Sequence, residues 1–294
     1  MNGRSESELI KIGTGLLDTF KYKKAIDYFS EAIQLNPANV EAFVLRGIAN
    51  FKVLNISDSL DDISKAIDLD GENHLAWFNK GEIFWYKGEL QGAEICYQKS
   101  NELSPGNLFY LTGLIQVNLK QKKPDMVIQY CNQILKDYPV DSFALKYRAS
   151  AYIRQLNYQA AIEDYLKLID AGKKGETLYN SLGFCYSKIG QFKKAFNNLS
   201  IALQMNPTHP YALNNMGYVK FAEGQYRKAI ELIEKSLEID PSNAYAYKNR
   251  ALVFIKLGEK ELALADLKAA RSLGYQEEYG SEVDELILQL TQAQ

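Results

Sequence analysis

The chain has 294 residues, of which 47% are hydrophobic and 24% are charged, and this composition is ordinary for a soluble folded protein. Its formal net charge of −2 argues against a protein that binds nucleic acid or another polyanion. No stretch approaches the 18 apolar residues of a membrane span, and the opening "MNGRSESELIKIG" lacks the apolar run of a signal peptide. We therefore expect a cytoplasmic protein without membrane contact.

One phrase of the sequence occurs three times. "KKAIDYFSEAIQLNPAN" at 23–39 returns as "KKAFNNLSIALQMNPTH" at 193–209 and as "RKAIELIEKSLEIDPSN" at 227–243. The offsets are 170 and 34 residues, and 170 is five times 34, so the period indicates a repeat architecture. Eight frames of 34 residues fit between Glu6 and Glu277 without insertion or deletion. They are 6–39, 40–73, 74–107, 108–141, 142–175, 176–209, 210–243 and 244–277.

Each frame is predicted to form a helix, a tight turn, a second helix and a loop. Positions 8 and 20 are mostly small, as at Gly47, whereas position 24 is mostly bulky, as at Ile63, so the two helices should pack closely. Proline at position 32 ends the second helix, and Asn or Asp at position 34 caps the next one. Position 15 should allow a positive φ because glycine occupies it at Gly88, Gly190, Gly224 and Gly258.

These columns resemble the tetratricopeptide repeat family over residues 6–277. The resemblance implies an all-α fold, an α-solenoid in which helix pairs form a right-handed superhelix and the first helices line a concave groove. Residues 1–5 precede the array. Residues 278–294 are predicted to form a capping helix, with Ser281 capping toward Asp284. The apolar stripe of that helix is Val283, Leu286, Ile287 and Leu290.

Two segments depart from the pattern. The fourth frame carries larger residues in its small columns (Ile115, Val127 and Ile134), which should widen the spacing of its helices or change their crossing angle. The join "DAGKKGET" between the fifth and sixth frames replaces the usual proline turn. A hinge at 172–175 and an ordinary loop of equal length both fit this join.

Catalytic chemistry finds no support in the sequence. The two histidines, His74 and His209, have no partner in sequence, and "GTGLLD" at 13–18 neither follows a strand nor contains a third glycine. Cys96, Cys131 and Cys185 match no zinc or redox spacing and are expected to be reduced packing residues. We therefore expect a protein that is not an enzyme and that holds no cofactor and no metal.

The resemblance implies that positions 2, 5, 9, 12 and 13 of each frame face the groove. In the last five frames these positions carry six basic residues and no acid, whereas acids outnumber Lys52 in the first three. Asparagine amides can bond to an extended peptide, and neighbouring aromatic rings are typical of binding hot spots. We therefore predict an acidic, partly apolar peptide in the second half of the groove. The candidate groove residues are Phe78, Lys146, Asn180, Phe184, Asn214, Tyr218 and Lys248.

Two alternatives stay open. Basic residues at position 13 lie near helix C-termini, where the macrodipole stabilises them without any ligand, and the aromatic residues can pack between repeats. The clamp with which some members of the family bind chaperone carboxylates is absent, because Lys146 is followed by Ser150 and then Ser181. The sequence thus favours an adaptor or scaffold that binds a peptide or protein partner. The alternative is a structural, self-associating module, a homo-oligomer that acts through its ends or its convex face.

Overall fold

The structure is a computed structural model that describes residues 4–276 and 280–292. Over these residues it contains seventeen α-helices and no strand. The chain divides into two compact units, unit 1 from Met1 to Ala151 and unit 2 from Tyr152 to Gln294. The division falls within α9 (Ser142–Arg154). Stacked helix pairs form each unit, so the predicted all-α solenoid fold is confirmed.

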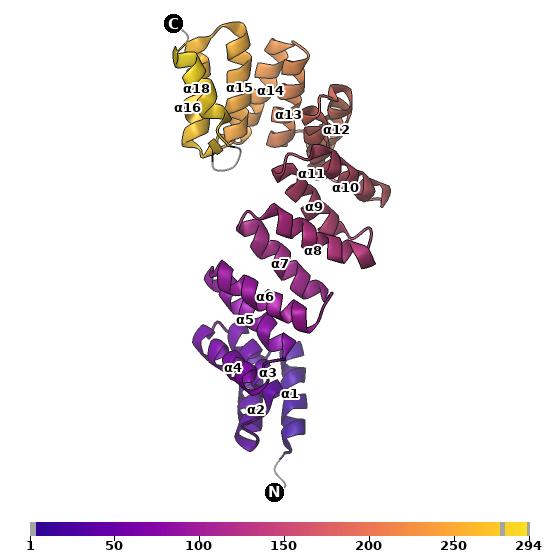
Figure 1. Cartoon of the computed structure of the whole chain (residues 1–294), viewed down its shortest axis with the longest axis vertical. Coiled ribbons are helices and arrows are strands. Elements are labelled where there is room, and N and C mark those ends of the chain that lie inside the picture. The colour runs from indigo at the N-terminus through magenta and orange to yellow at the C-terminus, as the bar shows by residue number, and fades with distance from the viewer. Residues whose placement is uncertain (1–3, 277–279, 293–294) are drawn as a thin grey trace. The chain divides into compact units, whose positions relative to one another are not determined.

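Unit 1 is built from four helix pairs followed by most of α9. In Figure 1 its helices run from indigo to magenta, and each pair packs against the next. Helices of one pair lie antiparallel because the turn between them is short. The pairs are α1 (Glu6–Asp18) with α2 (Tyr22–Leu35), α3 (Val40–Lys52) with α4 (Ile56–Leu69), α5 (His74–Lys87) with α6 (Leu90–Leu103), and α7 (Leu108–Lys120) with α8 (Pro124–Asp137).

Unit 2 continues the same arrangement to the C-terminal helix. The first helices of successive pairs, α11, α13 and α15, lie side by side. Its helices are α10 (Tyr158–Asp170), α11 (Glu176–Lys188), α12 (Phe192–Met205), α13 (Pro210–Ala222), α14 (Tyr226–Ile239), α15 (Ala244–Leu257), α16 (Lys260–Ser272) and α18 (Glu282–Gln292).

Glycine at position 8 lets the two helices of a pair touch. A Cβ added at Gly47 would lie 2.8 Å from the side chain of Ile63, and one added at Gly217 would lie 2.6 Å from that of Ile233. Both isoleucines are fully buried. The predicted packing of position 8 on position 24 is therefore confirmed at these pairs.

The fourth pair is packed differently from the glycine-containing pairs. Ile115, Val127 and Ile134 are all buried, together with Cys131. The backbones of α7 and α8 run close together over a shorter stretch than those of α5 and α6. The larger side chains of the fourth pair thus lie between its two helices, where the glycine-containing pairs leave no space for them.

Position 15 adopts a positive φ in every frame. The four predicted glycines have φ between 74° and 80°. The other four frames place Phe20, Leu54, Lys122 and Leu156 there, with φ between 57° and 64°. Side chains with a Cβ are disfavoured in this region, so these four turns hold strain that the glycine turns do not.

Helix α18 covers the apolar face of the last repeat. Val283 is fully buried against a cluster that includes Leu267 of α16 and Tyr275. Leu286, Ile287 and Leu290 pack on the same cluster, so the predicted capping helix is confirmed where it is described. Its predicted start at residue 278 lies outside the described residues. The expected pairing of Ser281 with Asp284 is not what forms, because the Ser281 hydroxyl donates to Glu285 at 2.6 Å.

Candidate functional site

Unit 2 contains a cavity of about 210 Å³ on the face formed by its first helices. Aromatic rings, amides and a hydroxyl line it, and they come from α9, α11, α13 and α15. Six of the eight lining residues occupy groove-facing positions 2, 5, 9 or 12 of consecutive frames, and the other two, Ser181 and Asn215, occupy position 6. The lining residues are Ile153, Asn180, Ser181, Phe184, Tyr211, Asn214, Asn215 and Tyr245.

The two predicted asparagines bind their neighbours in the fold. Asn215 Nδ2 donates to Asn180 Oδ1 at 2.9 Å, and Asn249 Nδ2 donates to Asn214 Oδ1 at 3.0 Å. All four residues are buried, so each bond fastens one first helix to the next. Asn180 and Asn214 thus have a structural role that the sequence pattern did not reveal, although both also line the cavity.

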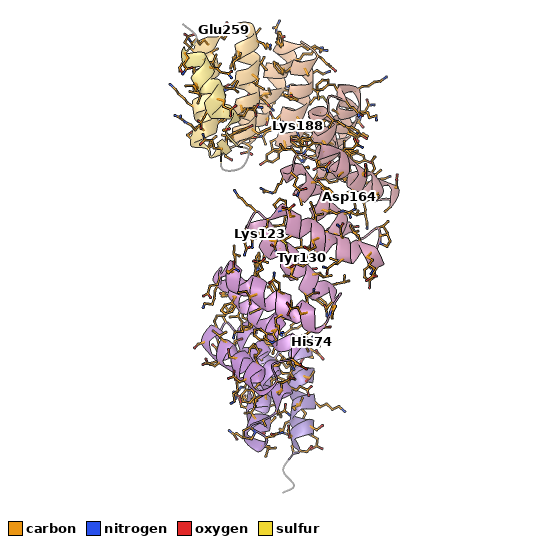
Figure 2. All side chains as sticks on the ribbon, in the orientation of Figure 1. His74, Lys123, Tyr130, Asp164, Lys188 and Glu259 are labelled. Carbon is orange, nitrogen blue, oxygen red and sulfur yellow. The ribbon has the colours of Figure 1, made fainter. Side chains whose placement is uncertain are left out.

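The ammonium group of Lys188 lies among three aromatic rings. Its Nζ is 5.5 Å from the ring centre of Phe184, 5.9 Å from that of Tyr218 and 5.3 Å from that of Tyr245. Burial, and then the nearby charge of Lys248, lower the pKa of Lys188 to about 8. Contact with ring faces partly compensates a buried cation for lost hydration. Lys188 is labelled in Figure 2.

Lys248 is buried and paired with a residue of the C-terminal helix. Its side chain is 3% exposed, and its Nζ lies 2.7 Å from Glu282 Oε1. The Tyr275 hydroxyl donates to the other carboxylate oxygen of Glu282 at 3.0 Å. Burial acts to raise the pKa of Glu282, but Lys248 and the Tyr275 hydroxyl outweigh it and hold that pKa below its usual value.

Two of the predicted groove residues belong to unit 1. Phe78 on α5 is half-buried, and its ring packs against those of Tyr97 and Tyr110 at centroid distances of 5.7 and 5.0 Å. Lys146 on α9 is exposed, with its Nζ 5.9 Å from the Tyr147 ring. Phe78 therefore acts as a packing residue, while Lys146 keeps its charge at the surface.

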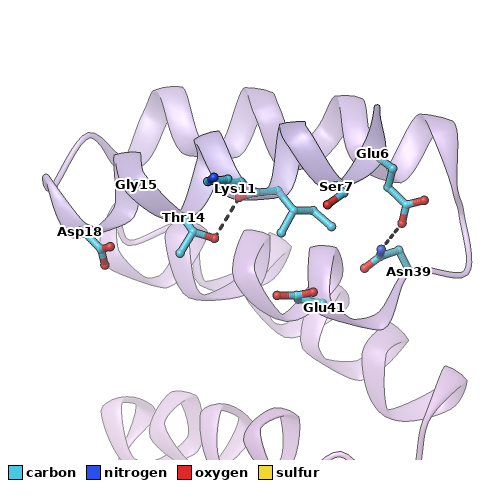
Figure 3. Close-up of a pocket in the computed structure, with 9 residues that line it drawn as sticks. Glu6, Ser7, Lys11, Thr14, Gly15, Asp18, Asn39 and Glu41 are labelled. Carbon is cyan, nitrogen blue, oxygen red and sulfur yellow. Dashed lines mark hydrogen bonds between the residues drawn. The ribbon is translucent and has the colours of Figure 1, made fainter. Parts of the chain in front are cut away.

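The first pair of unit 1 borders a wide cavity of about 660 Å³ (Figure 3). Three acids, Glu6, Asp18 and Glu41, line it with Lys11, and Glu6 is hydrogen-bonded to the side chain of Asn39. The acidic character that the sequence predicts for the first frames is thus gathered on one surface. This surface lacks the aromatic rings that line the cavity of unit 2.

The macrodipole alternative for the basic residues also finds support. All five basic residues that the sequence placed at position 13 lie in the last turn of a helix, where the carbonyl ends favour positive charge. They are Lys52, Lys120, Arg154, Lys188 and Lys256. Lys248 lies in the middle of α15 and is not explained in this way.

Sequence reasoning missed Glu282, Tyr275, Asn215 and Asn249. A signal for Glu282 exists, because it lies 34 residues after Lys248 and so falls at position 5 of a ninth frame. The eight-frame array ended at Glu277, where the columns of small residues stop, and the tail was interpreted only as a cap. Glu282, the first residue of α18, in fact completes the charged part of the site.

Two of the three cysteines have raised thiol pKa values. Burial raises the pKa of the Cys96 thiol to about 11 and that of Cys185 to about 12, so neither is a ready nucleophile at neutral pH. Over residues 4–276 and 280–292 no three His, Cys, Asp or Glu side chains are grouped to hold a metal ion. In the same part of the chain, no helix combines the length and the apolar character that a membrane crossing requires.

Stacked pairs of helices that recur every 34 residues define a helical repeat protein. Family models described as tetratricopeptide repeat match residues 10–39, 74–107 and 210–243. With the seventeen helices of the described residues, which fit about eight repeats, these matches show that the chain is a tetratricopeptide repeat protein. This family is generally a non-catalytic protein-interaction module.

Relatives and a solved structure are consistent with this assignment. The chain is 25% identical over 191 residues to the BBSome complex member BBS4 of Bos taurus, covering 64% of this chain and 36% of the relative. It is 31% identical over 102 residues to Hsp70-Hsp90 organizing protein 3 of Arabidopsis thaliana, covering 35% of this chain and 18% of the relative. The chain therefore spans well under half the length of these relatives.

The fold is also that of a tetratricopeptide repeat protein from Parabacteroides merdae whose crystal structure is known. The TM-score is 0.68 at 20% identity, over 86% of this chain and 98% of the other. At this identity the similarity establishes the fold and nothing more.

Proposed function

We propose that the protein is a non-enzymatic scaffold that holds a segment of a protein partner in the cavity of unit 2. The observation that carries this proposal is the cavity itself, lined by three aromatic rings and by polar side chains from successive first helices. Tyr211, which lines the cavity, is 49% exposed although its side chain is large and partly apolar. Aromatic rings beside fixed polar groups are the usual composition of a protein-binding hot spot.

The chemistry of the cavity favours an acidic and partly apolar segment. Lys188 and Lys248 both place their ammonium groups over the ring of Tyr245, which lines the cavity. Within the described part of the chain, Glu282 is the one carboxylate at ion-pair distance from either lysine. The rings can take apolar side chains of the same segment, while the cations favour its acids.

The names of the relatives agree with a role in assembly. One relative is named as a complex member and the other as an organizing protein. Because the chain spans only part of each, any particular partner of theirs is outside this proposal.

A peptide selection tests the proposal. Random twelve-residue peptides displayed on phage would be selected on the wild-type protein and counter-selected on a Ser181→Glu/Tyr211→Ala variant, which changes two partly exposed lining residues. We expect selected peptides enriched in Asp, Glu and aromatic residues that bind the wild type at least tenfold more tightly than the variant, because hot-spot losses reach 2 kcal/mol or more. A Lys235→Ala variant on the exposed face of α14 serves as the matched control.

Equal binding of the selected peptides to all three proteins would contradict the proposal. Self-association, the alternative function, has its own readout in light scattering. A molar mass that rises with protein concentration and falls in the Ser181→Glu/Tyr211→Ala variant would assign this surface to a second copy of the chain.

A further inference from the structure

Glu282 occupies the charged end of the unit-2 site as a ligand would. Its carboxylate accepts from Tyr275 and pairs with Lys248, yet its own side chain is 48% exposed while that of Lys248 is 3% exposed. The cation is thus part of the fold, and the anion reaches it from the solvent side. A buried ammonium needs an anion, but that anion can come from elsewhere.

The two lysines of the site carry more positive charge than the carboxylate of Glu282 can offset. Lys188 lies close enough for its charge to act on Glu282, but no described carboxylate, Glu282 included, is within ion-pair distance of Lys188. Among the described residues, the charge of one carboxylate therefore acts on two ammonium groups. A like-charged pair of this kind attracts a second anion or a more highly charged one.

Tyr245 connects this charged end to the cavity. Its ring lines the cavity, lies 5.3 Å from Lys188 Nζ and 5.4 Å from Lys248 Nζ, and stacks on Tyr275 at a centroid distance of 6.0 Å. A segment in the cavity that carries an acid next to an aromatic or aliphatic residue would therefore reach both lysines without leaving the rings.

Glu282 can leave without unfolding its helix. Val283, the next residue, is fully buried and anchors α18 on the last repeat. Glu282 is the first residue of α18, so its side chain can turn into solvent by rotation about its own bonds while the helix stays docked. Near a helix N-terminus its charge remains favourable in either position.

We propose that Lys188, Lys248 and Tyr275 form a carboxylate-binding subsite, that Glu282 is its internal occupant, and that an acidic side chain of a bound partner segment takes its place. The inference rests on the proposed function for the identity of the ligand, but the subsite can be tested without a partner. Glu282 then acts as a competitor that sets a threshold, since only a segment with a well-placed acid displaces it.

The first experiment uses glutarate, which reproduces the side-chain carboxylate of glutamate, at constant ionic strength. Its affinity is measured by calorimetric titration for wild type, Glu282→Gln and Glu285→Gln, where Glu285 is an exposed acid of the same helix that bonds to Ser281. We expect Glu282→Gln to bind glutarate about tenfold more tightly than wild type, as follows if the subsite is free about one tenth of the time. Glu285→Gln should match wild type, and Glu282→Gln/Lys248→Met should lose the gain.

Equal glutarate affinity in wild type and Glu282→Gln, or a gain that survives Lys248→Met, overturns the subsite. Circular dichroism shows whether Glu282→Gln is folded; if it is not, Glu282→Asp keeps the charge, shortens the reach and should give an intermediate gain. A peptide from the selection above separates the two proposals. Loss of peptide binding in Ser181→Glu/Tyr211→Ala supports the scaffold even where glutarate shows no gain, whereas a glutarate gain without that loss supports the subsite alone.

Discussion

The two units have the same kind of interior packing, but they differ on the face that is formed by their first helices. In both, glycine at position 8 packs on a buried apolar residue at position 24, as Gly47 does on Ile63 and Gly217 on Ile233. At position 5, unit 1 has apolar residues such as Val44, which is buried in a hydrophobic cluster. Unit 2 has Asn180, Asn214 and Lys248 there. The contact between positions 8 and 24 thus recurs in both units, whereas the residues at position 5 differ.

The turns within the pairs vary as well. At position 15, where φ is positive, unit 1 has a side chain with a Cβ in three of its four frames, whereas unit 2 has glycine in three of its four. Unit 2 has mostly glycine at position 15 and buried polar residues at position 5, whereas unit 1 has mostly side chains with a Cβ at position 15 and apolar residues such as Ile10, Val44 and Phe78 at position 5.

The largest expected effect on stability comes from substitutions at position 8, where both units have the same packing. Gly47→Val and Gly217→Val each place atoms inside the van der Waals radius of an isoleucine, so each should lower the free energy of unfolding by about 3 kcal/mol. Both tryptophans, Trp77 and Trp85, lie in unit 1. In urea denaturation we therefore expect Gly47→Val to shift the fluorescence transition, and Gly217→Val to shift mainly the circular dichroism transition.

Gly15 supplies the control for these substitutions. It is a helical, exposed residue of α1, and a Cβ added to it meets no atom within 4 Å. Gly15→Val should leave both transitions nearly in place. A loss as large as that of Gly47→Val would mean that a β-branched side chain is costly anywhere on these first helices, and that packing against position 24 does not set the cost.

How far the sequence predicted the molecule follows from the range of each interaction. Contacts between positions 8 and 24 lie within one frame, so the repeated columns were enough to predict them. The bond from Asn249 to Asn214 joins residues 35 apart, position 5 of one frame and position 6 of the next. That pairing depends on the rotation between neighbouring repeats, which a 34-residue period does not specify. Glu282 was missed for the same reason, because its role depends on where α18 docks.

The second prediction sharpens the contrast between lysines at one frame position. Lys188 in unit 2 is partly buried among rings with a pKa lowered to about 8, whereas Lys52 in unit 1 is exposed. Lys188→Met should raise the free energy of unfolding by about 2 kcal/mol at pH 7, because the methionine removes a poorly hydrated charge and keeps contact with the rings. Lys52→Met should change it by less than about 0.5 kcal/mol.

The pH dependence follows from the sign of the shift. Between pH 8 and the ordinary lysine pKa of about 10.4, unfolded chains keep a proton on Lys188 that folded chains have released. The free energy of unfolding of the wild type therefore rises with pH in this window. The advantage of Lys188→Met should therefore shrink across that window. Charged and titratable groups that face Lys188 are Lys248, Glu282, Tyr218 and Tyr245, so the same series in Glu282→Gln should start from a less stable protein. An advantage that is constant with pH would show that packing, and not charge, explains the gain.

The third prediction concerns the asparagine bonds of unit 2. Asn214→Ala leaves the Nδ2 donor of Asn249 buried without a partner, and should cost about 2 kcal/mol in denaturation. In the double variant Asn214→Ala/Asn249→Ala the orphaned donor is gone. The two single losses should then exceed the double loss by about 1 kcal/mol.

Unit 1 provides the matched cycle. Val44 and Asn79 occupy the same two frame positions, but Asn79 Nδ2 donates to the carbonyl of Leu75 in its own helix. Losses from Val44→Ala and Asn79→Ala should add within about 0.5 kcal/mol. Coupling of equal size in both cycles would show that the neighbouring helices, and not the amide bond, transmit the effect.

The smallest expected effect tests the strained turns of unit 1. Leu54 is 62% exposed at φ 64°, so its side chain contributes little packing and its backbone is disfavoured. Leu54→Gly should raise the free energy of unfolding by about 0.5–1 kcal/mol and move the tryptophan fluorescence transition to higher urea.

Leu35 is 59% exposed at the last position of α2, where its φ is negative, so Leu35→Gly removes a similar side chain without relieving strain. That substitution should lower stability by about 0.5–1 kcal/mol, since glycine costs this much in a helix. Opposite signs for the two leucines would show that the left-handed turn, and not the exposed leucine, is what unit 1 carries at a cost and unit 2 has mostly replaced with glycine. Equal signs would place the difference between the units in their first-helix faces alone.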